Sequence, residues 1–277
     1  MQIMIRIWKI TNTAIEEMHL AEQNSLDAIT RQLPEGYYST FRTYDGGRRV
    51  LGMAPHLRRL YDPVTRPDVS ASTLRRQLLT LLEPYRPDEA RVRVMMTKGG
   101  EAYITIEPLK LLPREVYERG VRVETIELQR ESPRLKSTAF IGMSDAERKH
   151  IAREGIFEAL MVRNGKILEG MTSNFFYVGQ VANLSYVATA REGILLGITR
   201  RTVLRVARGR GLEVRYRALS LDQLSAVSEV FLTSSSRGVV PIVQIDDVTI
   251  GQGRPGPITE QLAAAYEAYV IEKAERI

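Results

Sequence analysis

Three glycine-containing turn motifs between short runs of β-forming residues constrain the fold of this chain more than any other feature. The motifs are Asp45-Gly46-Gly47, Gly99-Gly100 and Asn164-Gly165. Glycine and asparagine tolerate the positive φ angles that tight hairpin turns require, so each motif predicts a pair of antiparallel strands. The predicted hairpins join 37–44 to 48–51, 91–97 to 102–106, and 157–163 to 166–168.

Amphipathic helices are expected between the strands. The clearest covers 72–83, where leucines recur on one face: Leu74, Leu78, Leu81 and Leu82. Other helices are predicted at 55–60, 144–153, 199–210 and 257–273, with a short one opened by the capping-box sequence Ser220-Leu221-Asp222-Gln223. Further strands are predicted at 121–128, 175–178, 214–217, 229–233 and 239–245. This order predicts an α+β (mixed α/β) fold.

The chain is long enough for two domains. It has 277 residues, of which 44% are hydrophobic, and chains of this length split into one or two cores. The stretch 108–113 begins and ends with proline and loses the periodicity of the segments around it. We therefore expect one domain at 1–113 and a second at 114–277.

The composition argues against several classes of protein. The net charge is +6, but the basic residues are scattered in pairs without interleaved aromatics, so nucleic-acid binding is not expected. No apolar run is long enough to cross a membrane, and residues 1–9 do not resemble a secretion signal. The chain has no cysteine, which removes disulfide and thiolate chemistry, and its three histidines lack a second metal ligand at the usual spacing. A cytoplasmic, metal-free protein is the simplest expectation.

Lysine is rare in this chain, and one lysine stands out. There are seven lysines, and Lys136 follows Pro133 in a loop after a predicted strand. Anion-binding donors are expected at the arginine pair Arg58-Arg59, at the helix start around Gly197, and at the serine turn 234–236. Each motif alone is also compatible with an ordinary surface loop. Together with the carboxylate of Glu169 they form the set that pyridoxal 5'-phosphate (PLP) requires.

The order of several motifs resembles a known family. The segments 158–165 and 168–176, the latter reading Leu-Glu-Gly-Met-Thr-Ser-Asn-Phe-Phe, are similar to those of the fold-type IV (class IV) PLP-dependent aminotransferases. This group includes branched-chain and D-amino-acid aminotransferases and aminodeoxychorismate lyases. The other matching motifs follow in the same order: His56-x-x-Arg59-Leu60, Lys136, Gly197-Ile198-Thr199-Arg200, 229–233, Val240-Pro241 and 256–259.

The resemblance implies a fold and a set of site residues. It implies a small N-terminal α/β domain, a larger C-terminal PLP-binding domain with a β-barrel-like core, the cofactor between them, and a homodimer. Lys136 matches the Schiff-base lysine and lies 33 residues before Glu169, which matches the partner of the pyridine nitrogen. The residues that match the phosphate ligands are Arg59, Ile198, Thr199 and Ser235, and Ser236 lies in the turn that receives the substrate carboxylate.

Two departures from the family bear on the substrate. Ser39 stands where the family commonly has glutamate, on a strand that also carries Arg42. Arg91-Val92-Arg93 stands where branched-chain enzymes have Tyr-x-Arg. Strand alternation places Arg91 and Arg93 on one face, which is then either solvated or turned toward an anion. We therefore predict that Arg42, Arg91, Arg93 and Ser236 bind the substrate, with acceptors such as 2-oxoglutarate favoured.

The expected activity is transfer of an amino group from an amino acid, branched-chain-like, to a 2-oxo acid. The alternatives on the same fold are a D-amino-acid aminotransferase and an aminodeoxychorismate lyase, which would use the same lysine to eliminate pyruvate. A non-catalytic, anion-binding scaffold is the alternative from another class. The sequence itself does not distinguish the donor, the acceptor or the chirality of the substrate.

Overall fold

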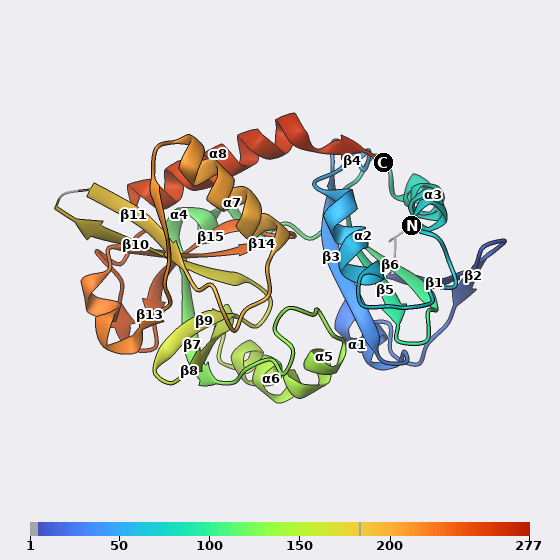
Figure 1. Ribbon diagram of the computed structural model, residues 1–277, viewed down its shortest axis with the longest axis horizontal. Coiled ribbons are helices and arrows are strands. Elements are labelled where there is room, and N and C mark those ends of the chain that lie inside the picture. The colour runs from blue at the N-terminus through green and yellow to red at the C-terminus, as the bar shows by residue number, and fades with distance from the viewer. Residues whose placement is uncertain (1–4, 183) are drawn as a thin grey trace. The chain divides into compact units, whose positions relative to one another are not determined.

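The computed structural model describes residues 5–182 and 184–277, and these form two compact units (Figure 1). The first unit contains the chain up to Lys110, then Leu135–Met143 and Lys273–Ile277. The second contains Leu111–Arg134 and Ser144–Glu272. A division after residue 113 differs from this one because two later segments return to the first unit. Ser137 forms a bridge with Tyr37, and Glu275 pairs with Val50.

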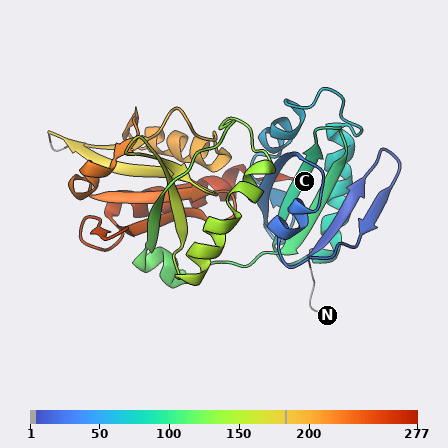
Figure 2. The same cartoon turned by 90° about the horizontal axis from the view of Figure 1, so that it is seen from below.

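The first unit is built on an antiparallel sheet of seven strands in the order β17-β4-β3-β5-β6-β1-β2. The hairpins predicted around Gly46 and Gly99 are confirmed, and Figure 2 shows the β1–β2 hairpin at the edge of this sheet. The strand bounds are β1 Arg6–Ile10, β2 Ile15–Met18, β3 Gly36–Tyr44, β4 Arg49–Val50, β5 Ala90–Thr97, β6 Ala102–Pro108 and β17 Glu275–Arg276.

Helices cover both faces of this sheet. One face packs against α2 (Met53–Tyr61) and α3 (Ala71–Leu82), and the leucine face predicted for α3 is buried there. The other face packs against α1 (Leu26–Arg31) and α5 (Ala139–Met143), with Tyr38 in its core. A 3-10 turn, η1 (Glu83–Tyr85), follows α3. Successive residues of β3 therefore alternate between two different environments.

The second unit contains a sheet of 10 strands, six of which close into a barrel in the order β10-β14-β15-β7-β8-β9. Closure is made by one pair, Glu169 of β9 with Asn174 of β10. A β-barrel-like core is therefore confirmed. The strands are β7 Val121–Glu127, β8 Glu158–Arg163, β9 Lys166–Gly170, β10 Asn174–Val181, β11 Leu184–Thr189, β12 Glu213–Tyr216, β13 Leu219–Ser220, β14 Glu229–Ser234, β15 Gly238–Ile245 and β16 Val248–Thr249.

The β8–β9 hairpin matches its prediction closely. Asn164 and Gly165 both have positive φ, at 51° and 68°, as a two-residue turn of this kind requires. The barrel interior is filled by aliphatic and aromatic side chains that include Leu160, Ile167 and Phe175. The turn thus sets the register that brings the end of β9 to the barrel seam.

Helices pack on the outside of the second unit. α7 (Ile198–Gly209) lies against β12 and β14, and α4 (Arg114–Arg119) against β15 (Figure 1). α6 (Asp145–Arg153) packs on β8, and α8 (Pro257–Lys273) begins where the buried Glu229 carboxylate accepts N–H groups from Ile258 and Thr259. Within the described residues, no helix is long and apolar enough to span a bilayer.

The predicted capping box at Ser220 is wrong. Ser220 belongs to β13, where it pairs with Lys166, and its side chain makes no capping hydrogen bond. The short helix that follows is the 3-10 segment η2 (Leu221–Ala226). The pairing of Ser220 with β9 fixes its extended backbone, so the local sequence pattern is overridden by the sheet.

Candidate functional site

Lys136 is held against β3 of the first unit by backbone hydrogen bonds. Its carbonyl accepts the N–H of Tyr38 at 3.0 Å, and the N–H of Thr138 donates to the carbonyl of Gly36 at 2.9 Å. The Thr138 hydroxyl accepts the Gly36 N–H at 3.0 Å. Lys136 therefore sits in a loop that is pinned to the sheet, which gives its side chain a fixed origin.

The side chain of Lys136 lies over Tyr38. Its Nζ is 4.8 Å from the centre of the Tyr38 ring, and the guanidinium of Arg93 lies 4.6 Å from that ring centre. An aromatic face attracts cations by its quadrupole. The structure therefore brings two of the predicted site residues, Lys136 and Arg93, to the same tyrosine.

Arg93 is buried and already paired within the first unit. Its side chain is 5% exposed, and Nη1 lies 2.7 Å from Asp27 of α1. Nη1 also donates to the Leu26 carbonyl, and Nε donates to the Thr40 hydroxyl at 3.1 Å. The chain's own carboxylate thus neutralises Arg93, which is a third outcome beside the two, solvent or a bound anion, that the sequence suggested. A substrate contact for Arg93 stays a prediction.

Replacing Arg93 by leucine is expected to lower the free energy of unfolding by about 3 kcal/mol, because Asp27 would lose its ion pair with Arg93 in a largely buried position. Urea unfolding measures this change. Arg91→Leu is the matched control, since its partner Glu107 accepts at 2.8 Å from a side chain that is 38% exposed, and such pairs contribute less than about 1 kcal/mol. An unchanged stability of Arg93→Leu with a raised KM for 2-oxoglutarate would instead favour the substrate role.

The other predicted residues of the first unit lie at different places on it. Arg42 is half-buried on β3, opposite Arg91 in the sheet register, with its guanidinium 4.7 Å from the ring centre of Tyr44. Arg59 lies on α2, one turn after the buried His56. The Ser39 hydroxyl, at the position that departs from the family, is hydrogen-bonded to Nδ1 of His56 at 2.7 Å. Ser39 thus fastens β3 to the helix that carries Arg59.

Glu169 lies at the barrel seam of the second unit and is 1% exposed. Its Oε1 accepts from Nε of Arg130 at 3.0 Å, and both side chains of this ion pair are buried. Its Oε2 accepts from Nδ2 of Asn174 at 2.9 Å and from the N–H of Leu195 at 3.0 Å. Carboxylates buried without such donors would be neutral. Both oxygens of the buried Glu169 carboxylate therefore accept hydrogen bonds from the protein itself.

The start of α7 is shaped for an anion. The helix has 12 residues, and its N-cap residue Gly197 makes no side-chain capping hydrogen bond. The first turn carries Thr199, whose hydroxyl lies 3.3 Å from that of Ser235 in the β14–β15 turn. Helix N-termini attract anions through their N–H groups and dipole. The structure thus brings together Ile198, Thr199 and Ser235, with Ser236 next in the same turn.

A buried arginine adds positive charge at the start of α7. Arg200 is 4% exposed, and its Nη2 donates to the carbonyl of Ala190 at 2.8 Å. Its Nε has no hydrogen-bond partner within the described part of the chain. Burial lowers the pKa of the Arg200 guanidinium. A positive charge held in the first turn of α7 adds to the potential that favours an anion there.

Gly197 is required for the approach of α7 to the barrel seam. A Cβ at this position would lie 2.1 Å from Oδ1 of Asn174, the residue whose amide contacts Glu169. No substituent fits at that distance, so Asn174 or the helix start would have to move. The absence of a side chain at Gly197 therefore lets the start of α7 lie against Asn174, which contacts the buried Glu169 carboxylate.

Sequence reasoning missed several residues that hold this site. Arg130 and Asn174 fix Glu169, and the pair Glu158–Arg237 joins the Gly170–Ser173 loop to the serine turn. The signal for Arg130 was its place six residues before Lys136 in the same loop. Its partner lies 39 positions away in the chain, and no local pattern identifies that pairing.

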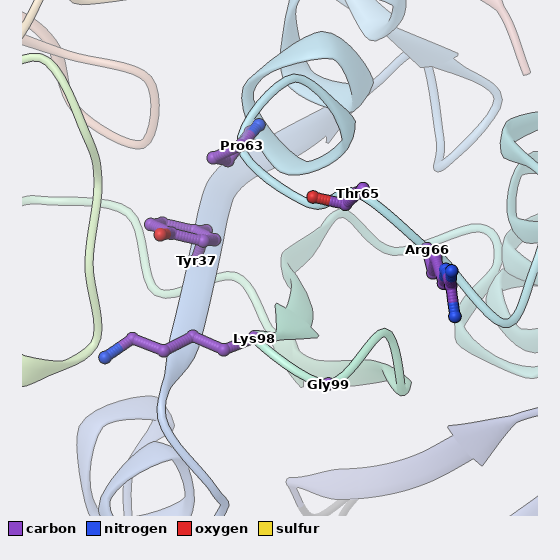
Figure 3. Close-up of a pocket in the computed structure, with 6 residues that line it drawn as sticks. All are labelled: Tyr37, Pro63, Thr65, Arg66, Lys98 and Gly99. Carbon is purple, nitrogen blue, oxygen red and sulfur yellow. The ribbon is translucent and has the colours of Figure 1, made fainter.

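A separate pocket of about 500 Å³ in the first unit holds none of the predicted site residues. Figure 3 shows the Lys98 side chain extending past Tyr37, with Pro63 and Thr65 on the loop that lines the pocket. The Lys98 ammonium is paired with Glu35 at 2.5 Å, and both side chains are exposed. The contacts of Lys98 thus give it a partner in the protein itself.

The residues of the second unit fit the two polar ends of PLP. A buried glutamate paired with an arginine suits a protonated pyridine nitrogen, and a helix start with two neighbouring hydroxyls suits a phosphate. The first unit supplies a pinned lysine. The chemistry of the donors in the second unit and the fixed lysine of the first unit are each consistent with the cofactor that the sequence motifs implied.

Comparisons with known proteins point to one family. The family model for amino-transferase class IV matches residues 36–245. The D-alanine aminotransferase of Bacillus licheniformis is 26% identical over 267 residues, which is 88% of this chain and 91% of that protein. The probable branched-chain-amino-acid aminotransferase of Thermotoga maritima is 28% identical over 266 residues, 92% and 94% of the two chains.

A solved structure gives the same fold. The PLP-bound form of a hypothetical aminotransferase from Mycobacterium tuberculosis superposes with a TM-score of 0.76 at 21% identity, covering 96% of this chain and 99% of that one. The family match spans far more than half of the sequence and includes Lys136, Glu169 and the start of α7. The chain therefore belongs to the class IV aminotransferases, a family of PLP-dependent transaminases.

Proposed function

We propose that this protein transfers an amino group from a branched-chain-like amino acid to a 2-oxo acid, with PLP carried on Lys136. The observation that supports this most strongly is the buried Glu169, held by Arg130 and Asn174 at the seam of the barrel. A carboxylate kept charged in this way stabilises a protonated pyridine nitrogen. When bound, PLP supplies an electron sink for the bonds at the substrate Cα.

Each residue has a proposed role. The Lys136 amine would hold the cofactor and move the proton at the substrate Cα, and the Glu169 carboxylate would be the partner of the pyridine nitrogen. Arg59, Ile198, Thr199 and Ser235 bind the phosphate. Ser236 and Arg42 bind the substrate carboxylate, with Arg91 and Arg93 as further candidates. Because Arg91 and Arg93 already contact Glu107 and Asp27, the contacts support Ser236 and Arg42 more strongly.

The visible spectrum of the purified protein with a panel of amino donors tests the proposal. We expect bound PLP to absorb in the visible, and the band to disappear with L-leucine and return with a 2-oxo acid. Borohydride reduction and peptide mapping should place the pyridoxyl group on Lys136. An adduct on Lys149 or Lys166 would contradict the assignment. Pyruvate released from aminodeoxychorismate, with a band that no donor bleaches, would identify the lyase.

A D-amino-acid aminotransferase is the second candidate. It is favoured by the similarity to the D-alanine aminotransferase over 88% of this chain. The same panel separates the two if it contains both enantiomers of alanine and leucine. Bleaching by D-alanine and not by L-leucine would keep the transaminase activity and replace the substrate.

We also propose a homodimer and a cytoplasmic location. The homodimer is the assembly implied by the resemblance to the family, and the cytoplasm was inferred from the cysteine-free sequence. Light scattering of the purified protein measures the first. A mass of one 31.3 kDa chain in solution would contradict it.

A further inference from the structure

The β14–β15 turn, which carries Ser235 and Ser236, is fastened at both ends by one arginine. Arg237 Nε donates to the Ser234 hydroxyl at 3.1 Å, and the Arg237 carbonyl accepts from the Tyr117 hydroxyl at 2.9 Å. Residues 235 and 236 lie between these two anchors. A turn of this length with both ends fixed has little backbone freedom left.

The same guanidinium reaches the loop that follows Glu169. Its Nη2 donates to Oε2 of Glu158 and to the Thr172 hydroxyl, both at 2.7 Å. Oε1 of Glu158 accepts from the N–H of Thr172 at 2.6 Å and from the Ser173 hydroxyl at 3.0 Å. Glu158 and Arg237 thus connect the Gly170–Ser173 loop with the serine turn.

The pair is built into the protein and is not a surface contact. The Glu158 side chain is 2% exposed and that of Arg237 is 22% exposed. Burial alone would raise the pKa of Glu158, but the Arg237 charge and the hydrogen bonds from Thr172 outweigh it, and the pKa lies below its usual value. Arg237 also lies 5.1 Å from the Phe157 ring. A Cβ on Gly170 would lie 2.6 Å from Oε1 of Glu158, so this glycine admits the carboxylate.

We propose that the Glu158–Arg237 pair positions the serine turn so that Ser235 meets Thr199 at the start of α7, and thereby sets the affinity for the cofactor phosphate. This rests on the proposed function. Neither residue needs to touch the phosphate, so both are positioning residues. The 3.3 Å between the hydroxyls of Thr199 and Ser235 is the geometry that the pair maintains.

The test compares PLP with pyridoxal, which lacks the phosphate, as ligands of the full-length apoprotein. Arg237→Gln is expected to weaken PLP binding at least about tenfold, about 1.4 kcal/mol, while the Kd of pyridoxal is unchanged. Inorganic phosphate should also lose its ability to raise the Tm. Arg237→Lys keeps a positive charge beside Glu158, but lysine has no planar guanidinium to reach Ser234 and Thr172 together. Its PLP affinity should therefore lie between those of the wild type and Arg237→Gln.

A double-mutant cycle and a surface control complete the design. If the pair acts as a unit, the double variant Glu158→Gln with Arg237→Gln should weaken PLP binding no more than Arg237→Gln alone. Arg215→Gln, which breaks the exposed pair with Glu213 in the same unit, should leave both affinities unchanged. An unchanged ratio of PLP to pyridoxal affinity in Arg237→Gln would overturn the inference. Wild-type protein that binds neither ligand would instead refute the proposed function.

Discussion

Replacing Lys136 by alanine is expected to reduce amino transfer by at least about 10⁴-fold, because the variant loses both the covalent attachment of PLP and the base that moves the proton at the substrate Cα. The stability should change little, since the backbone bonds that pin this loop to β3, from Tyr38 to Lys136 and from Thr138 to Gly36, do not involve the Lys136 side chain. Steady-state kinetics with saturating PLP and a urea unfolding curve measure the two quantities.

Lys166→Ala is the matched control for this prediction. Lys166 is an exposed lysine that begins β9, directly after the Asn164-Gly165 turn. It should keep normal turnover. Partial recovery of Lys136→Ala by added methylamine, with no effect on Lys166→Ala, would show that the missing group is an amine base. Turnover within tenfold of the wild type would exclude Lys136 as the catalytic lysine.

Replacing Glu169 by glutamine is expected to have two separate effects. In the proposed function Glu169 is the charge partner of the pyridine nitrogen, and its loss should then reduce turnover by about 10²–10³-fold. The buried Arg130 would lose its counter-ion, which should lower the free energy of unfolding by about 3–5 kcal/mol. The second effect follows from the structure alone, and it means that the single variant cannot assign the chemical role.

The double variant Arg130→Met with Glu169→Gln separates the two effects. It removes the buried cation that has lost Glu169 and replaces it by an apolar chain of similar length, so most of the lost stability should return. Turnover should stay low. Recovery of turnover together with stability would mean that Glu169 acts only by keeping the barrel seam folded. Urea unfolding and kcat, measured on the same preparations, distinguish these results.

The parts of the fold that short-range chemistry determines were predictable. The Asn164-Gly165 turn, the leucine face of α3 and the bounds of α8 follow from turn geometry and helical spacing, and each is confirmed. The strands β1 and β11 were not predicted. The β1–β2 connection contains no glycine, and its turn is closed by the Thr11 hydroxyl accepting the Ala14 N–H, a contact without a strong sequence signal.

The candidate site was only partly predictable for a related reason. Motifs predict Lys136 and Glu169 as site residues because the roles proposed for them require particular residue types at a family spacing. The supporting contacts depend on tertiary pairing. Arg130 contacts Glu169 across 39 positions of the sequence, and Asn174 contacts it where β9 and β10 pair. Arg93 shows the converse. Its strand face was predicted from alternation, but its partner Asp27 comes from a helix far earlier in the chain that the sequence did not reveal.

The single-pair seam between β9 and β10 has a thermodynamic consequence. One registered pair, Glu169 with Asn174, closes the ring, so any opening of the barrel at that point must separate the carboxylate from its amide donor on β10. A ligand that binds only the closed form stabilises it by an amount that grows with the logarithm of its concentration. If the cofactor engages Glu169, the cellular supply of the cofactor governs how often the barrel opens. Depletion of the cofactor then causes degradation of the protein as well as loss of activity.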